Sequence, residues 1–226
     1  MSDRLKLVLF DCDGTLVDSQ HMIVAAMHHA FDAHDLPLLE REKVLSIVGL
    51  SLFEAVGTLL GPVDPKLLAS VVDGYKNAFT HLRGQPDLHE PLYEGALDAL
   101  DALAQDENLL LGVATGKSQK GLQNILALHG IRDRFVTLQT ADDAPSKPHP
   151  AMVQQAMAAT GVRPENTIVI GDTTFDIQMA RNAGAHALGV DWGYHQSTDL
   201  FDAGASRVLE GFGEVPEAVT ALWRAD

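Results

Sequence analysis

The sequence predicts an α/β protein, a doubly wound parallel sheet of five strands in the order 3-2-1-4-5 with an inserted all-helical cap domain. Three observations predict this fold class. Short apolar runs alternate with amphipathic helical segments in the second half of the chain. A first apolar run near the N-terminus ends in two aspartates, and the long stretch that follows it has helical periodicity and no strand pattern.

The first predicted strand is Leu5–Phe10, and Asp11 and Asp13 follow it. Residues two apart in an extended chain point to the same face, so both carboxylates lie on one side of the strand end. Ligands bind outside the carboxyl ends of open parallel sheets. Two carboxylates there can hold a hard cation, and one can attack a phosphorus or carbon centre. The turn Gly14-Thr15 lets backbone N–H groups face an anion.

The region from Asp18 to Leu82 predicts about four helices, because apolar residues recur there at spacings of three and four. The predicted helical segments are Met22–Phe31, Val44–Val48, Leu52–Leu60 and Leu67–Phe79. A linker that contains proline and glycine, Arg83–Pro91, ends the region. We assign residues 18–90 to a helical cap with hinge linkers, and residues 1–17 and 91–226 to a Rossmann-like catalytic core. An insertion just after the first strand would act as a lid over the site.

The rest of the chain alternates strands and helices, which indicates βαβ units. The predicted strands are Leu109–Thr115, Phe135–Leu138, Thr167–Gly171 and Ala185–Val190, and the helices lie near Gly95–Ala104, Ser118–Leu128, Pro150–Thr160 and Phe175–Ala183. In this order the first strand stands at the centre of the sheet, beside the point where the winding direction reverses.

Further candidate site residues stand where the other strands end. Thr115 and Gly116 end one strand and precede a helix, an arrangement that can seat an anion. Lys147, between a turn and two prolines, would balance the aspartates and the charge of a substrate. Asp172 can complete the oxygen coordination of a magnesium ion. Asp176 can cap the next helix, bind the ion through water or support the ligands from behind, and we favour the last role.

Composition limits the partners. The chain has 226 residues, a formal charge of −15 and one cysteine. The negative charge argues against nucleic acid as the main partner, and a single cysteine excludes an internal disulfide and a cysteine-based zinc cluster. The apolar runs are too short to span a membrane, and MSDRLK has no signal-peptide pattern, so we expect a cytoplasmic protein. Apolar residues of the cap can pack internally or on a twin, so both a monomer and a homodimer are open.

Taken together, these segments resemble the haloacid dehalogenase superfamily of phosphotransferases. DCDGT matches the first motif, Thr115 the second, Lys147 the third and GDTTFD the fourth. The helical insertion between the first and second motifs looks like the cap of the branch that contains phosphoglycolate phosphatases and β-phosphoglucomutases. The resemblance covers nearly the whole chain.

The resemblance implies a Mg²⁺-dependent phosphatase that hydrolyses a small phosphorylated metabolite through an aspartyl-phosphate. Asp11 would be the nucleophile and a metal ligand. Asp13 would be the general acid/base, with its backbone carbonyl touching the metal. Thr115 and Lys147 would bind the transferring phosphoryl group, and Asp172 would be a metal ligand.

Other functions within and beyond the family are less well matched. Haloalkanoate dehalogenases lack the metal-binding DxDGT arrangement. β-Phosphoglucomutases carry a cap arginine in a V-G-x-S-R-type loop, where this chain has Leu52. Phosphoglycolate phosphatases often have Thr-Asn-Lys at the second motif, where this chain has Thr115-Gly116-Lys117. A phosphomutase remains the alternative enzyme, and a non-catalytic sensor of a phosphometabolite is the alternative outside enzymes. The substrate would be selected by the cap, with the loop Gly49–Ser51 and the helix Met22–Phe31 as candidates.

Overall fold

A parallel six-stranded sheet forms the centre of the computed structural model, which describes residues 5–83, 85 and 88–224. The strand order is β3-β2-β1-β4-β5-β6, and all neighbouring strands run parallel. The strands are β1 (Lys6–Phe10), β2 (Leu109–Thr115), β3 (Thr137–Thr140), β4 (Thr167–Gly171), β5 (His186–Val190) and β6 (Arg207–Leu209). The predicted fold class and the order of the first five strands are confirmed.

Two details of the sheet differ from the prediction. The edge strand β6 was not predicted, because three residues are too few to show a periodic pattern. The strand predicted at Phe135–Leu138 begins two residues later, at Thr137. Phe135 follows a short 3₁₀ turn, η2 (Arg132–Arg134), and its buried ring packs in the hydrophobic core. Phe135 is therefore apolar because it is buried in the core, and it does not belong to the strand.

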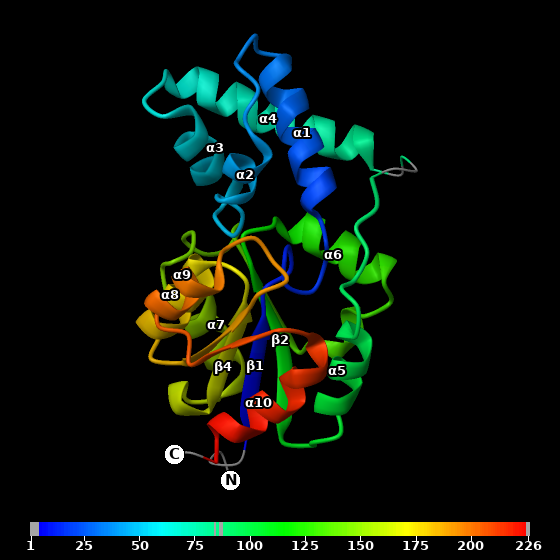
Figure 1. Cartoon of the computed structure of the whole chain (residues 1–226), viewed down its shortest axis with the longest axis vertical. Helices are drawn as coiled ribbons and strands as arrows, with labels where there is room; N and C mark the ends of the chain where they lie inside the picture. The colour runs from blue at the N-terminus through cyan, green and yellow to red at the C-terminus, as the bar shows by residue number, and fades with distance from the viewer. Residues whose placement is uncertain (1–4, 84, 86–87, 225–226) are drawn as a thin grey trace.

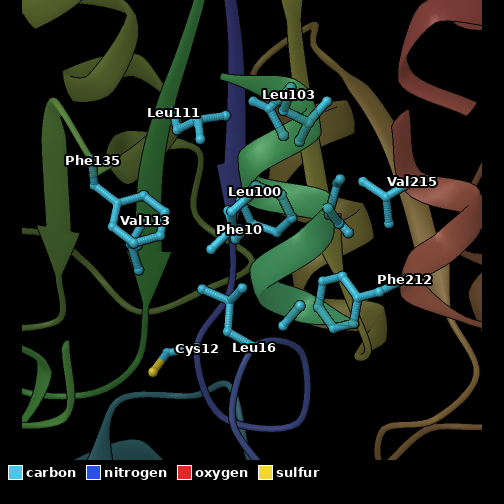
Figure 2. Packing of buried hydrophobic residues seen from close by; sticks show 14 of the residues in the cluster. Phe10, Cys12, Leu16, Leu100, Leu103, Leu111, Val113, Phe135, Phe212 and Val215 are labelled. Atoms are coloured by element: carbon cyan, nitrogen blue, oxygen red, sulfur yellow. The ribbon is translucent and has the colours of Figure 1, made fainter. Parts of the chain in front are cut away.

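Side chains of β1 alternate between two hydrophobic clusters, one on each face of the sheet. Val8 and Phe10 face one cluster, while Leu7 and Leu9 face the other. The first cluster is covered by α5 (Ala96–Leu103), α6 (Gln119–Leu128) and α10 (Val215–Leu222), and Figure 2 shows part of its packing around Phe10 and Leu100. The second is covered by α7 (Ala151–Thr160), α8 (Thr174–Asn182) and α9 (Ser197–Asp202). This two-sided covering is the doubly wound arrangement that the sequence predicts.

Four helices stand above the carboxyl ends of the strands (Figure 1). They are α1 (Gln20–Asp32), α2 (Arg41–Leu45), α3 (Leu52–Leu60) and α4 (Pro65–Leu82). They share a hydrophobic cluster of their own, with Met27, Val44, Val56 and Val71 among its buried members. None of the helices within the described residues is long and apolar enough to cross a bilayer.

The two chain segments that connect these helices to the sheet lie side by side. Val17 and Leu92 form an antiparallel bridge. The N–H of Asp18 donates to the carbonyl oxygen of Pro91 at 2.8 Å, and the N–H of Tyr93 donates to that of Leu16 at 3.0 Å. The predicted linker Arg83–Pro91 includes residues 84, 86 and 87, which lie outside the described residues.

Truncation of Phe10 tests the packing around β1. Its side chain has no exposed surface, so Phe10→Ala should lower the free energy of unfolding by about 3–5 kcal/mol through lost burial and a residual cavity. Leu128, with 70% of its surface exposed, provides the control, and Leu128→Ala should change stability by less than about 0.5 kcal/mol. Urea denaturation followed by circular dichroism measures both. Equal stability of the two variants would contradict this account of the core.

Candidate active site

Three carboxylates from two neighbouring strand ends meet in the interior. Asp11 follows β1, Asp172 follows β4 and Asp176 lies in the first turn of α8. One oxygen from each lies within 4.8 Å of the others, and all three side chains are buried. They meet because β1 and β4 are adjacent and in register, with Phe10 opposite Ile170.

A single buried ammonium group bridges two of these carboxylates. Lys147 Nζ lies 2.7 Å from Asp11 Oδ1 and 2.6 Å from Asp176 Oδ1, and the lysine has no exposed surface. Burial lowers the pKa of Lys147, but the two carboxylates more than offset this, so its pKa lies above the ordinary value and the group is charged. The pKa of Asp11 is raised to about 7 by burial, against the opposing effect of Lys147. One cation therefore faces three acidic groups.

Asp172 is held by one donor at each oxygen. The hydroxyl of Thr15 donates to Oδ1 at 2.8 Å, and the backbone N–H of Tyr194 donates to Oδ2 at 2.9 Å. Burial, and then the charges of Asp176 and Asp11, raise the pKa of Asp172, which shows that the site penalises its negative charge. The turn before Thr15 requires glycine, because Gly14 has a φ of +90° and a Cβ there would lie 2.3 Å from Asp172 Oδ2.

Both carboxylate oxygens of Asp176 accept hydrogen bonds from other residues of the protein. Its Oδ1 accepts from Lys147, while Oδ2 accepts from the hydroxyl of Thr173 at 2.6 Å and from the N–H of the same residue at 3.2 Å, which forms a capping box at the start of α8. In contrast, Asp11 Oδ2 is buried and has no hydrogen-bond partner among the described residues. This oxygen is the one free to meet a ligand.

Asp13 lies apart from the three-carboxylate cluster and has different partners. Lys117 Nζ lies 2.8 Å from its Oδ1 and 3.0 Å from its Oδ2, and the hydroxyl of Ser19 donates to Oδ1. The two aspartates of the first motif are thus separated in environment. Asp11 is paired with Lys147, and Asp13 is paired with a second lysine.

Thr115 and Gly116 lie where the helical group meets the sheet. Thr115 ends β2, is buried, and accepts a hydrogen bond from the N–H of Lys117 at 3.2 Å. At Gly116 an added Cβ would lie 2.4 Å from the carbonyl oxygen of Leu50 and 2.6 Å from that of Gly49. Residue 116 therefore has to be glycine, because any larger side chain there would prevent the loop between α2 and α3 from approaching the strand ends.

A cavity of about 640 Å³ separates the helical group from the strand ends. The sheet side contributes Asp11, Asp13, Thr115 and Gly116, and the helical side contributes both segments that the sequence marks as specificity candidates: Ile23 and Met27 of α1, and Gly49, Leu50 and Ser51 of the loop. The two sides touch directly. The N–H of Ser51 donates to Ser146 Oγ at 2.8 Å, and His195 Nε2 donates to the carbonyl oxygen of Ser46 at 3.2 Å.

The structure brings all the predicted site residues to one end of the sheet, in two positions. Asp11, Asp13, Thr115 and Gly116 line the cavity, whereas Lys147, Asp172 and Asp176 surround Asp11 from within the protein. Sequence reasoning gave no role to Lys117 or Ser19. Ser19 precedes the first helix, where a serine is expected as a cap, so its contact with Asp13 has no separate signature. The sequence feature that could have identified Lys117 as a site residue is its position two residues after Thr115, the last residue of β2.

Comparison with known proteins agrees with this geometry. The sequence profile described as haloacid dehalogenase-like hydrolase matches residues 8–190. A protein of Dickeya dadantii named probable phosphatase IndB is 34% identical over 96% of this chain and 94% of its own length. The pyrophosphatase PpaX of Bacillus pumilus is 34% identical over 87% of this chain and 88% of its own length.

The fold is shared with solved structures. A predicted phosphoglycolate phosphatase from Haemophilus somnus superposes with a TM-score of 0.81 at 23% identity, covering 95% of this chain and 98% of its own. The profile match spans β1 to β5 and includes all four strand ends that carry the acidic and basic groups described above. The chain belongs to the haloacid dehalogenase-like hydrolase family, as its four motifs predict.

Proposed function

We propose that this chain is a Mg²⁺-dependent phosphatase that hydrolyses a small phosphate monoester through an aspartyl-phosphate on Asp11. The observation that carries the proposal is the free oxygen Oδ2 of Asp11. It belongs to a residue that lines the cavity, it has no partner among the described residues, and the other oxygen of the same carboxylate is fixed by Lys147. A held carboxylate with one unengaged oxygen is suited to nucleophilic attack.

The residues fit a hard divalent cation. Three buried carboxylates face one ammonium group. Burial is the largest cause of the raised pKa values of Asp11 and Asp172, and the negative charge of Asp176 raises both further. We infer that Asp11, Asp172 and the backbone carbonyl of Asp13 would hold Mg²⁺. Asp176 would support them, because the ammonium group of Lys147 bonds to one of its oxygens and Thr173 donates twice to the other, whereas each oxygen of Asp172 accepts a single hydrogen bond. When bound, Mg²⁺ would neutralise charge on the phosphoryl oxygens.

In the first step, Asp11 attacks the phosphorus atom while the bond to the leaving oxygen breaks. Asp13 donates a proton to that oxygen, so that an alcohol leaves and an aspartyl-phosphate remains. Attack requires Asp11 as the carboxylate, and Lys147 favours this form against the effect of burial. In the second step, Asp13 accepts a proton from water, the water oxygen attacks phosphorus, and the Asp11 carboxylate and inorganic phosphate are released.

The transferring phosphoryl group would be bound by Thr115, by the N–H groups near Gly116 and by Lys147. Thr115 and Gly116 line the cavity at the end of β2. Lys147 would act across Asp11, since its ammonium group is buried and already bonded to that carboxylate. Fixed donors and cations of this kind stabilise the charge that develops during phosphoryl transfer.

We further propose that residues 18–90 form a cap and residues 1–17 and 91–226 the catalytic core. The contacts of Ser51 with Ser146 and of His195 with Ser46 bring the two parts together over the cavity. Such a closed arrangement would exclude bulk water from the aspartyl-phosphate and leave room for one attacking molecule. The cytoplasmic location stays a prediction, and the monomer and the homodimer both stay open.

The substrate class follows from the cavity and the relatives. The similar proteins are named as a phosphatase, a pyrophosphatase and a phosphoglycolate phosphatase, which supports a small phosphorylated metabolite as substrate. A phosphomutase would need a cationic group for a second phosphate at the position of Leu52, and the apolar side chain there lines the cavity. This favours hydrolysis over isomerisation.

Replacement of Asp11 tests the proposed chemistry. Phosphate release from a panel of phosphate esters is expected to require Mg²⁺, and Asp11→Asn should lower it by at least about a thousandfold because the nucleophile is lost. Asp202, an exposed residue that ends α9, provides the control as Asp202→Asn. Release that persists in Asp11→Asn contradicts the proposal, as does isomerisation of a sugar phosphate without release from any ester.

Metal binding can be measured without turnover. Saturating Mg²⁺ at about 100 times its dissociation constant should stabilise the wild type by about 2.7 kcal/mol, because an ion that binds the carboxylate cluster of the folded chain, and not the unfolded chain, shifts the folding equilibrium by mass action. At about 2–4 °C per kcal/mol for a chain of this size, the melting temperature should rise by roughly 5–10 °C. Asp172→Asn should abolish most of this rise, while Asp202→Asn should retain it. An equal rise in both variants would place the metal elsewhere.

Gly116→Ala tests whether the docked position of the cap loop matters. An added Cβ would collide with the carbonyl oxygens of Gly49 and Leu50 and displace the loop. Displacement by about 1 Å should lower kcat/KM roughly 10- to 100-fold with little change in melting temperature. Gly211→Ala is the control, since a Cβ there meets nothing within 4 Å and the backbone is extended. Equal activity of the two variants would show that this contact is unimportant.

A further inference from the structure

Lys117 joins three parts of the molecule. Its Nζ binds both oxygens of Asp13 at 2.8 and 3.0 Å, lies 3.7 Å from Glu90 Oε1, and stands 5.2 Å from the centre of the Phe79 ring. Asp13 belongs to the core, Glu90 to the second connection between core and cap, and Phe79 to α4 of the cap. Only 9% of the lysine side chain is exposed.

Glu90 is an unusual residue for a linker. Its side chain is 4% exposed, and Oε1 has no hydrogen-bond partner among the described residues although Lys117 lies just beyond hydrogen-bonding distance. Its other oxygen lies 3.9 Å from an Arg83 nitrogen. Burying an incompletely bonded carboxylate is costly, so a stabilising role for the fold does not explain it. Its pKa is raised by burial and lowered by Lys117, which makes the lysine its main electrostatic partner.

The backbone of Glu90 is anchored to the core. Its carbonyl oxygen accepts a hydrogen bond from His129 Nε2 at 2.7 Å, and the next residue, Pro91, accepts from the N–H of Asp18 in the first connection. Ser19, which follows Asp18, donates to Asp13 Oδ1. Both connections between cap and core therefore reach the carboxylate of Asp13, one through a hydroxyl group and the other through the ammonium group of Lys117.

We propose that Lys117 is a positioning residue for Asp13 and that Glu90 makes this positioning depend on the connection between cap and core. Lys117 holds the carboxyl group of Asp13 where it can pass the proton that it took from water in the preceding turnover to the leaving oxygen. A shift of about 1 Å toward Glu90 would complete a hydrogen bond with Oε1 at the expense of the bonds to Asp13. The ammonium group is shared between the acid/base and the linker, so the position of the cap sets the position of Asp13.

The inference rests on the proposed function, and for the first step it predicts a loss that depends on whether the leaving oxygen needs a proton. An alkyl phosphate needs a proton on its leaving oxygen, whereas p-nitrophenolate leaves without one. Because kcat/KM reports the step that expels the leaving group, a misplaced Asp13 should impair phosphoglycolate and spare p-nitrophenyl phosphate. Loss of a structural contact or of phosphoryl binding would impair both esters equally.

The test compares kcat/KM for these two esters, in saturating Mg²⁺, among the wild type and three variants. Lys117→Met should lower the value for phosphoglycolate roughly 10- to 100-fold and that for p-nitrophenyl phosphate less than about threefold. Glu90→Gln should show the same selectivity with a smaller loss, because Lys117 keeps its bonds to Asp13 but loses the charge that ties its position to the linker. The double variant should match Lys117→Met, because Glu90 acts through the lysine. The double variant also removes one charge of each sign, which protects folding if the loss of the ammonium group in Lys117→Met leaves too much buried negative charge on Asp13 and Glu90.

Lys43→Met is the matched control, since Lys43 is exposed on α2 away from the cavity, and its two kcat/KM values should equal those of the wild type. Equal losses for both esters, or no loss, would overturn the role of Lys117. If Glu90→Gln lowers kcat/KM for phosphoglycolate as much in the Lys117→Met variant as it does in the wild type, Glu90 does not act through Lys117, and its proposed role is overturned. If the wild type releases phosphate from neither ester, the alkyl phosphate that the panel identifies as a substrate takes the place of phosphoglycolate. A wild type that releases phosphate from no ester of the panel would instead refute the hydrolase function, and this inference with it.

Discussion

An excess of buried negative charge is the constraint on which the site depends. Asp11, Asp172 and Asp176 converge at the strand ends with one ammonium group, that of Lys147, between two of them. Every neighbouring feature reduces the cost of this excess. The hydroxyl of Thr15 and the N–H of Tyr194 bond to Asp172, and the capping box of α8 bonds to Asp176. The carboxylate left incompletely bonded is the one that the proposed chemistry uses.

A second charge pair places the two aspartates of the first motif in different environments. Asp11 faces inward to Lys147, and Asp13 faces Lys117 and Ser19 near the connections to the four helices. A nucleophile benefits from a fixed position, whereas an acid/base has to serve a leaving group in one step and water in the next. The bond of Asp11 to a fully buried lysine, and the contacts of Asp13 with residues at the two connections, are consistent with that division.

The sequence predicts the parts of the site that depend on backbone topology. Asp11, Thr115 and Asp172 were found because each stands at the end of an apolar strand, and parallel strands bring their ends to one edge. The start of β3 was misplaced because Phe135 is apolar for a reason other than strand formation. Glu90 and Lys117 were missed because their contact joins residues 27 apart in sequence across a linker with no periodic pattern. Contacts between separately folded elements leave no local signature.

The paired connections at Val17 and Leu92 have a consequence for how such a molecule can change over evolutionary time. Because residues 18–90 leave and re-enter the sheet at adjacent points, this segment can be lengthened, shortened or exchanged without rethreading any strand. Variation in this segment can then alter which molecules enter the cavity while the strand ends stay as they are. Under the proposed assignment, the side chains of α1 and of the loop Gly49–Ser51 and the carboxylates at the strand ends belong to separate stretches of the chain, and Ser19 and Glu90 at the two junctions are the positions that link them.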